Sequence, residues 1–110
     1  MIVAFSVAPS GGESDSVSAA VAEAVRVVAE SGLPYEVNAM FTLIEGEWDE
    51  VMDVVRHAVE AASVGAARTS LVLKADIRPG YTNQLRAKVD RVHQHLASAS
   101  PPPRDADTSR

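Results

Sequence analysis

The sequence contains no cysteine, which excludes disulfides, thiolate nucleophiles and cysteine-ligated zinc sites. It is also short of positive charge, because ten Lys and Arg residues stand against fifteen Asp and Glu residues and give a formal net charge of −5. A nucleic-acid-binding surface needs a basic stripe, so we expect no nucleic-acid partner. No apolar run approaches the roughly 20 residues of a membrane-spanning helix, so we expect no membrane association.

Marks of export and of catalysis are lacking too. The first residues form a short apolar run with no basic segment before it, so we expect no signal peptide and a cytoplasmic location. Gly11-Gly12 is a bare pair, not a glycine-rich phosphate loop. Among the histidines His57, His93 and His95, the last two would point to different faces of a helix, which separates them as metal ligands. We predict no catalytic residue and no metal site.

The apolar residues that are present follow the order of a small α+β domain. Strands are predicted at four short apolar runs, 2–8, 34–40, 41–45 and 68–77, with a bend at 39–41. Helices are predicted where apolar residues recur every three or four positions: from Val17, after the cap cluster Ser14-Asp15-Ser16, to Ser31-Gly32; from Trp48 to Gly65; and after Thr82 as N-cap to Ala97.

This order predicts a ferredoxin-like βαββαβ fold, with a four-stranded antiparallel sheet, two helices on one face and an added C-terminal helix. We assign residues 1–97 to this single domain. Residues 98–110 contain three successive prolines and almost no apolar surface, which predicts a disordered tail.

Strand alternation predicts which residues lie on each face of the sheet. The helix-covered face would carry Val3, Phe5, Val7, Tyr35, Val37, Leu71 and Leu73. The open face would carry Ala4, Ser6, Glu36, Asn38, Met40, Val72 and Lys74. Because the open face is partly apolar, we expect a homo-oligomer built on sheet faces or edges.

Two polar residues interrupt predicted strands. The Ser6 hydroxyl must find a partner within an apolar strand, and a cross-strand or subunit hydrogen bond is one alternative to ligand binding. Asn38 is a poor strand former whose amide either satisfies the hairpin backbone or pairs with the edge of a heteroaromatic ligand.

The region around the second predicted helix start is acidic and holds the single tryptophan. Glu45 closes an apolar run, so its carboxylate either meets a cationic ligand or serves as a charge at a helix start. The position of Trp48 at a strand-to-helix junction favours a core residue over a stacking platform. The helix dipole explains the carboxylates between residues 45 and 53 without a metal ion.

Three blocks together resemble the MTH1187/YkoF-like family, the thiamine-binding proteins also called UPF0045 or DUF77. The blocks are MIVAFSVAPSG, SVSAAVAEAVRVVAESGLPYEVNAM and TLIEGEWDEVMDVVRHAVEAA, and the similarity runs from Met1 to about Arg78. The resemblance implies a ferredoxin-like fold and assembly through sheets into dimers, or into tetramers as dimers of dimers. It also implies non-enzymatic binding of thiamine or its hydroxymethylpyrimidine part near a subunit interface.

Carried over to this sequence, the resemblance implies six ligand-binding residues: Ser6, Asn38, Met40, Thr42, Glu45 and Trp48. Asn38 and Ser6 would hydrogen-bond the aminopyrimidine edge, Glu45 would face a positive charge, and Trp48 would form an apolar or cation–π wall. No cofactor is expected beyond thiamine as ligand.

Two other functions are alternatives to the binding module. The first is a structural or regulatory homo-oligomer that binds no small molecule. The second is an acylphosphatase-like hydrolase, which would need an arginine in the first loop, and residues 9–13 contain no basic residue. Because a fold does not determine its function, the binding module rests on the site residues.

Overall fold

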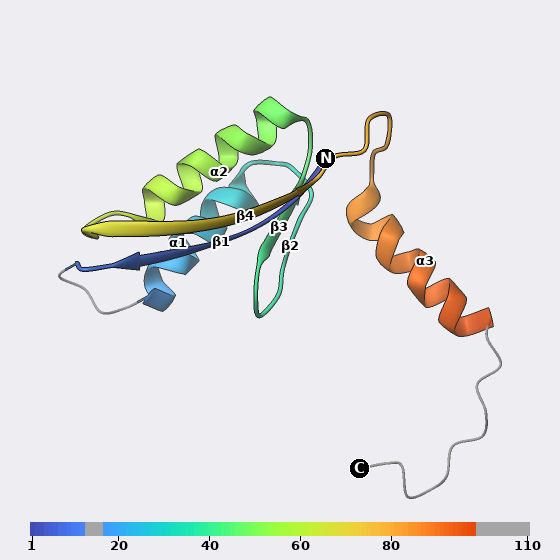
Figure 1. Cartoon of the computed structure of the whole chain (residues 1–110), viewed down its shortest axis with the longest axis horizontal. Helices are drawn as coiled ribbons and strands as arrows, with labels where there is room; N and C mark the ends of the chain where they lie inside the picture. Colours follow the sequence, from blue (N-terminus) through green and yellow to red (C-terminus); the bar gives the residue numbers. More distant parts are fainter. Residues whose placement is uncertain (13–16, 99–110) are drawn as a thin grey trace, which may run out of the picture.

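The computed structural model describes residues 1–12 and 17–98, and within them the chain forms four strands and three helices (Figure 1). The elements are β1 (Ile2–Ser10), α1 (Val17–Glu30), β2 (Tyr35–Val37), β3 (Thr42–Glu45), α2 (Trp48–Ala62), β4 (Arg68–Asp76) and α3 (Gln84–Ser98). The cap cluster predicted at 14–16 and the tail predicted after residue 98 lie outside the described residues.

The strands form one antiparallel sheet in the order β2-β3-β1-β4, which is the ferredoxin-like arrangement predicted from the sequence. Phe5 is paired with Thr42 on one side and with Leu73 on the other. Directly paired residues point to the same face, so the register confirms the helix-covered face predicted from strand alternation. Asn38 and Met40 follow β2 and lie in the hairpin turn, where the predicted strand 34–40 has already ended.

The hydrophobic core lies between this face and the helices α1 and α2, which pack side by side. Alternate β1 residues supply one layer, and the facing helix stripes supply the other. The buried apolar residues are Val3, Phe5, Val7, Ala24, Val28, Ile44, Val51, Val55, Ala58 and Ala62. In the described residues 1–12 and 17–98, no helix is both long and apolar enough to cross a membrane.

The third helix stands apart from this core and extends away from the end of the sheet (Figure 1). None of its residues is buried. It begins at Gln84, directly after Asn83, whose φ of 57° places it in the left-handed region that Asn tolerates. The prediction of Thr82 as its N-cap was therefore wrong, because a side chain from β3 caps this helix instead.

Candidate functional site

A cavity of about 200 Å³ opens at the tip of the β2–β3 hairpin. β1 continues to Ser10, but β3 pairs only with its residues 2–5, so the remainder of this β1 edge is free to face the turn and α1. Three segments supply the lining: Phe5, Ser6 and Val7 from β1, Val21 and Ala24 from α1, and residues 37–42 from the hairpin. Four of the six predicted ligand-binding residues, Ser6, Asn38, Met40 and Thr42, therefore meet at one cavity.

Asn38 organises the hairpin turn at this cavity. Its Oδ1 accepts the backbone N–H groups of Met40 and Phe41, both at 2.8 Å, and its own N–H donates to the Phe41 carbonyl at 3.0 Å. The side-chain oxygen thus satisfies backbone N–H groups of the hairpin, which was one of the two alternatives predicted for Asn38. Among the described residues its Nδ2 group has no hydrogen-bond partner, which leaves two donors for a ligand.

The other three residues of the cavity differ in exposure. Thr42 is 8% exposed and sits beside Phe5 on the helix-covered face. Ser6 is half-buried and pairs in register with Val72, which places its side chain on the open face. Met40 is 73% exposed at the rim. The cavity therefore has a buried hydroxyl at its wall and a flexible apolar side chain at its mouth.

Glu45 lies at the opposite end of β3. It lies three positions after Thr42, about 10 Å along a strand, and the odd offset turns the two side chains to opposite faces. Glu45 is 5% exposed, and its carboxylate accepts the N–H groups of Gln84 at 2.8 Å and Leu85 at 2.9 Å. A charge at a helix start was one prediction for Glu45, and the helix it caps is α3, nearly 40 residues further along the chain.

Trp48 is the first residue of α2 and is 54% exposed. The preference for a core position was therefore wrong, because the α2 residues that face the core begin at Val51. Trp48 does not line the hairpin cavity either, so the structure separates both Glu45 and Trp48 from the other four predicted site residues.

A second cavity of about 200 Å³, which the sequence reasoning missed, lies beside the Glu45 cap. The Arg78 guanidinium stacks over the Tyr81 ring at 3.5 Å from its centre. Lys88 of α3 donates to Asp76 of β4 at 2.5 Å, and this bond lowers the pKa of the Asp76 carboxyl below its ordinary value. The sequence signal that could have found this cavity is Arg78 and Tyr81 flanking the Pro79-Gly80 turn.

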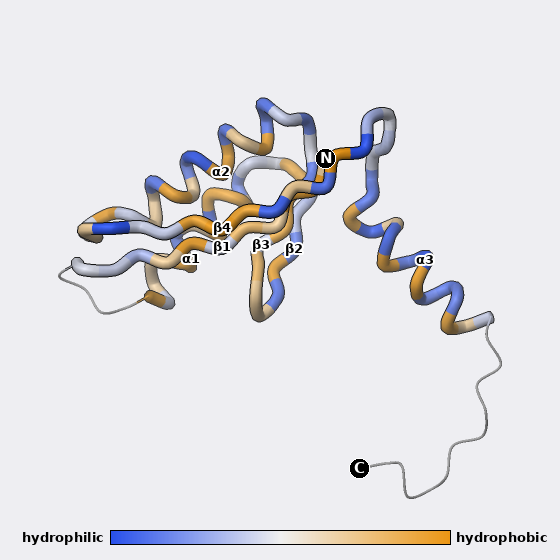
Figure 2. Tube along the Cα trace, in the orientation of Figure 1, coloured by the Kyte–Doolittle hydropathy of each residue, from blue (hydrophilic) through white to orange (hydrophobic). Residues whose placement is uncertain are grey.

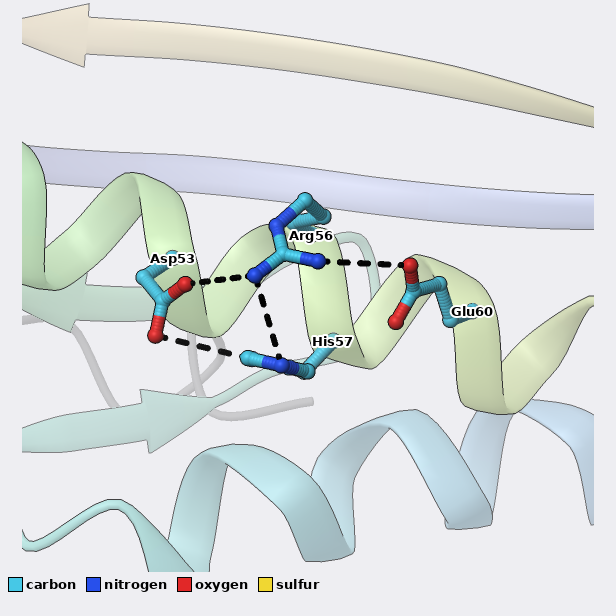
Figure 3. A network of polar contacts seen from close by, with 4 residues as sticks. All are labelled: Asp53, Arg56, His57 and Glu60. Carbon is cyan, nitrogen blue, oxygen red and sulfur yellow. Dashed lines mark hydrogen bonds and ion pairs between the residues drawn. The ribbon is translucent and has the colours of Figure 1, made fainter.

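The outer surface of α2 carries a network of polar residues centred on Arg56 (Figure 3). Arg56 contacts Asp53 at 2.8 Å and Glu60 at 3.4 Å, and the Asp53 hydrogen bond raises the pKa of the guanidinium. His57 Nδ1 lies 3.6 Å from Asp53. All four side chains are solvent-exposed neighbours on one helix, which is the ordinary geometry of intrahelical ion pairs. Within the described part of the chain, no three acidic or histidine side chains are grouped to hold a metal ion.

Comparison with known proteins places the chain in a family. The pattern of the family described as Thiamine-binding protein matches residues 3–93. A UPF0045 protein of Mycobacterium bovis is 50% identical over 97 residues, which cover 87% of this chain and 94% of the relative.

Two solved structures share the fold. A DUF77 domain from Bacillus cereus is 36% identical, with a TM-score of 0.69 over 77% of this chain and 84% of that one. A Thermotoga maritima protein described as a candidate thiamine biosynthesis/salvage protein is 27% identical, with a TM-score of 0.67 over 82% and 97% of the two chains. This chain belongs to the thiamine-binding protein family, UPF0045.

Proposed function

We propose that this protein is a non-enzymatic binding module that holds thiamine, or its hydroxymethylpyrimidine part, in the hairpin cavity. The observation that carries the proposal is the state of Asn38, whose oxygen is committed to the turn while its Nδ2 donors remain free. A side chain fixed in this way presents its donors in one orientation, so little conformational entropy is lost when they meet a ligand. The family name and the description of the Thermotoga relative support the same ligand class.

In the proposed complex, the Asn38 amide donates to a ring nitrogen of the aminopyrimidine. The Thr42 hydroxyl lines the cavity on the helix-covered face and supplies an acceptor for its exocyclic amine, while Ser6 borders the cavity with its side chain on the open face. Met40 covers the apolar face of the ring. The net charge of −5 favours the cationic vitamin over its phosphorylated forms.

Glu45 and Trp48 take other roles in this proposal. Both oxygens of Glu45 already accept N–H groups of α3, so we assign it to helix anchoring in place of ligand binding. Trp48 is exposed and lies outside the cavity lining. Within one copy of the chain, we propose no ligand contact for either residue.

The test is calorimetric titration of the full chain with thiamine, hydroxymethylpyrimidine and thiamine diphosphate in parallel. Saturable binding of one of the first two is the expected result. Asn38→Asp keeps an oxygen for the turn but removes the Nδ2 donors, so affinity should fall about tenfold or more. Asn83→Asp is the matched control, because it makes the same charge change at α3 and should leave affinity unchanged.

Two results would contradict the proposal. The first is heats no larger than dilution for all three compounds. The second is an Asn38→Asp protein that binds the uncharged hydroxymethylpyrimidine as tightly as the unmodified chain, because the free amide donors would then have no part in recognition.

We also propose that the protein is a homo-oligomer, a dimer or a dimer of dimers. β4 forms one edge of the sheet, and its nine residues have a strand neighbour on one side only. On the open face, Val72 is 58% exposed. An unpaired edge and a partly apolar face are the features that a second copy would cover.

These observations also favour the alternative of a structural or regulatory homo-oligomer that binds no small molecule. The two functions differ in what stabilises the protein. A ligand at a hundred times its Kd would stabilise the folded state by about 2.7 kcal/mol, whereas a pure oligomer would respond only to protein concentration. Thermal unfolding measured across both variables distinguishes them.

A further inference from the structure

The tip of the β2–β3 hairpin exposes a methionine at the mouth of the hairpin cavity. Residues 39–41 form this tip, which is coloured as hydrophobic in Figure 2 and projects away from the other strands. Met40 is 73% exposed and lines the cavity. Because little of this side chain is buried, it adds little to the stability of the fold and stays open to reaction with solutes.

The backbone of Met40 is nevertheless held in a fixed place. Its N–H group donates to Asn38 Oδ1 at 2.8 Å, and the N–H group of Phe41 donates to the same oxygen. Neither bond uses an atom of the Met40 side chain. The turn therefore keeps Met40 at the mouth of the cavity whatever the chemical state of its sulfur.

The amide donors proposed to recognise the ligand lie close to this side chain. Among the described residues the Asn38 Nδ2 group has no hydrogen-bond partner, and Asn38 and Met40 line the same cavity of about 200 Å³. A thioether sulfur is only a weak acceptor, so Met40 leaves these donors to a ligand. Oxidation to the sulfoxide makes the same side chain polar and gives it an oxygen that accepts hydrogen bonds.

The composition of the chain directs oxidation to this position. The sequence has no cysteine and only three methionines. The other two, Met1 and Met52, are half-buried, and Met1 packs against the core. Because oxidation of a sulfur follows its exposure, Met40 is the sulfur that a dissolved peroxide meets most readily.

We propose that Met40 is a peroxide-sensitive modification site that controls ligand binding in the hairpin cavity. The sulfur lone pair attacks one oxygen of hydrogen peroxide, so that an S–O bond forms as the O–O bond breaks. The proton of the transferred hydroxyl passes to the departing hydroxide, which leaves as water. The sulfur is thereby oxidised to the sulfoxide and the peroxide is reduced.

The sulfoxide would lower affinity in two ways. Its oxygen accepts from the Asn38 Nδ2 group and so competes with the ligand, and the side chain no longer presents an apolar surface to the ring. The change is reversible, because methionine sulfoxide reductases return the sulfoxide to the thioether. This inference rests on the proposed function and adds a means of regulating the same site.

The test treats the full chain with hydrogen peroxide and follows each methionine by peptide mass spectrometry. Met40 should gain oxygen several-fold faster than Met52. After removal of the peroxide, the Met40-oxidised chain is titrated with thiamine and with hydroxymethylpyrimidine, and affinity should fall about tenfold, as for the loss of one hydrogen bond. Without ligand, the NMR signals of the Asn38 side-chain amide should shift, whereas the Tm should not change because the turn keeps its backbone bonds.

Three variants separate the role of the sulfur from general damage. Met40→Leu cannot form a sulfoxide, so its affinity, whatever its starting value, should be the same before and after peroxide. Met52→Leu is the matched control in α2 and should keep the full loss of affinity on oxidation. Met40→Gln places an amide oxygen at a similar distance along the side chain and should lower affinity without any peroxide.

The outcomes separate this inference from the proposed function. If the unoxidised chain binds neither compound, both are overturned together. If that chain binds but full oxidation of Met40 leaves affinity unchanged, or if the loss persists in Met40→Leu, the modification site alone is overturned. Oxidation of Met40 no faster than that of Met52 would also overturn it, as would a loss of affinity that is matched by a fall in the Tm of the ligand-free protein.

Discussion

Helices α2 and α3 have the same length, fifteen residues, and both are amphipathic, yet their surroundings differ completely. Four residues of α2 are buried against the sheet and α1, whereas α3 buries none. Hydrophobic periodicity therefore predicts that a helix has a face to cover, and it does not say whether the cover comes from the same chain. The sheet and α1 of the same chain cover the apolar face of α2, whereas the described part of the chain buries no residue of α3.

The two helices also begin differently. At the start of α2, the Glu50 carboxylate accepts the N–H of Glu47 at 3.1 Å, which is a contact within one turn of chain. At the start of α3 the acceptor is Glu45, which lies 39 and 40 residues before the groups it caps. The start of α2 is thus encoded locally, and the start of α3 depends on the sheet being formed.

The largest effect is expected from a matched pair of truncations in the two helices. Val51→Ala in α2 removes two methyl groups from a fully buried position and should cost about 2–3 kcal/mol of unfolding free energy. Val92→Ala in α3 removes the same atoms from an exposed position, so in dissociated chains the cost should be near zero. Urea unfolding at low protein concentration measures both, and equal losses would contradict the contrast between the helices.

A smaller and more local effect is expected at the long-range cap. Glu45→Ala leaves the N–H groups of Gln84 and Leu85 without their acceptor and should weaken the attachment of α3 by about 1–2 kcal/mol. Amide hydrogen exchange should accelerate across the first turn of α3 while the β1 amides stay protected. Glu47→Ala is the control, because it alters the N-cap residue of α2 and should accelerate exchange at the start of α2, not of α3; if both variants accelerated exchange in α3 alike, the Glu45 cap would have no special role.

Loss of the Asn38 oxygen from the hairpin turn should lower the free energy of unfolding by about 1 kcal/mol. Asn38→Ala removes the acceptor of two backbone N–H groups, whereas Asn38→Asp keeps an oxygen there. Thermal unfolding should therefore show a lower Tm for the alanine variant only. Loss of stability in both variants to the same extent would mean that the Nδ2 group, and not the oxygen, supports the turn.

The smallest effect is a pH dependence at the second anchor of α3. The Lys88 contact lowers the folded-state pKa of Asp76, so its contribution is fully present above the ordinary aspartate pKa and is lost as the pH falls through the lowered value. An NMR titration of the Asp76 carboxyl should show this depressed pKa, and Lys88→Ala should return it toward its ordinary value. If the pKa of Asp76 did not change in Lys88→Ala, the ion pair would contribute nothing to the attachment of α3.

The sequence predicted well those features that depend on neighbouring residues. Strand alternation in β1 placed Val3, Phe5 and Val7 on the helix-covered face, because side-chain direction in a strand has a fixed period. The position of the hairpin bend was also predicted correctly. The turn has no Asn-Gly pair, and the Asn38 side chain stabilises it by accepting backbone N–H groups.

The features that the sequence did not predict depend on contacts between distant segments. Thr82 looked like an N-cap because its residue type suits that position, but the cap is Glu45, and nothing local to either segment pairs them. Trp48 is predicted as a core residue because of its size, while its orientation is set by the docking of Val51 and Val55 in the next two turns. Residue preference is a weak guide when tertiary packing decides the outcome.

The Glu45 cap also limits how far this domain can be shortened. A chain ending before Gln84 would leave the carboxylate of Glu45, a residue now 5% exposed, without the backbone donors that hold it in the described structure. Such a charge is costly to keep at a poorly hydrated site, so the truncated sheet would open around the end of β3 to admit water. A minimal βαββαβ unit cut from this protein should therefore carry Glu45→Gln, which replaces the stranded charge by a neutral amide.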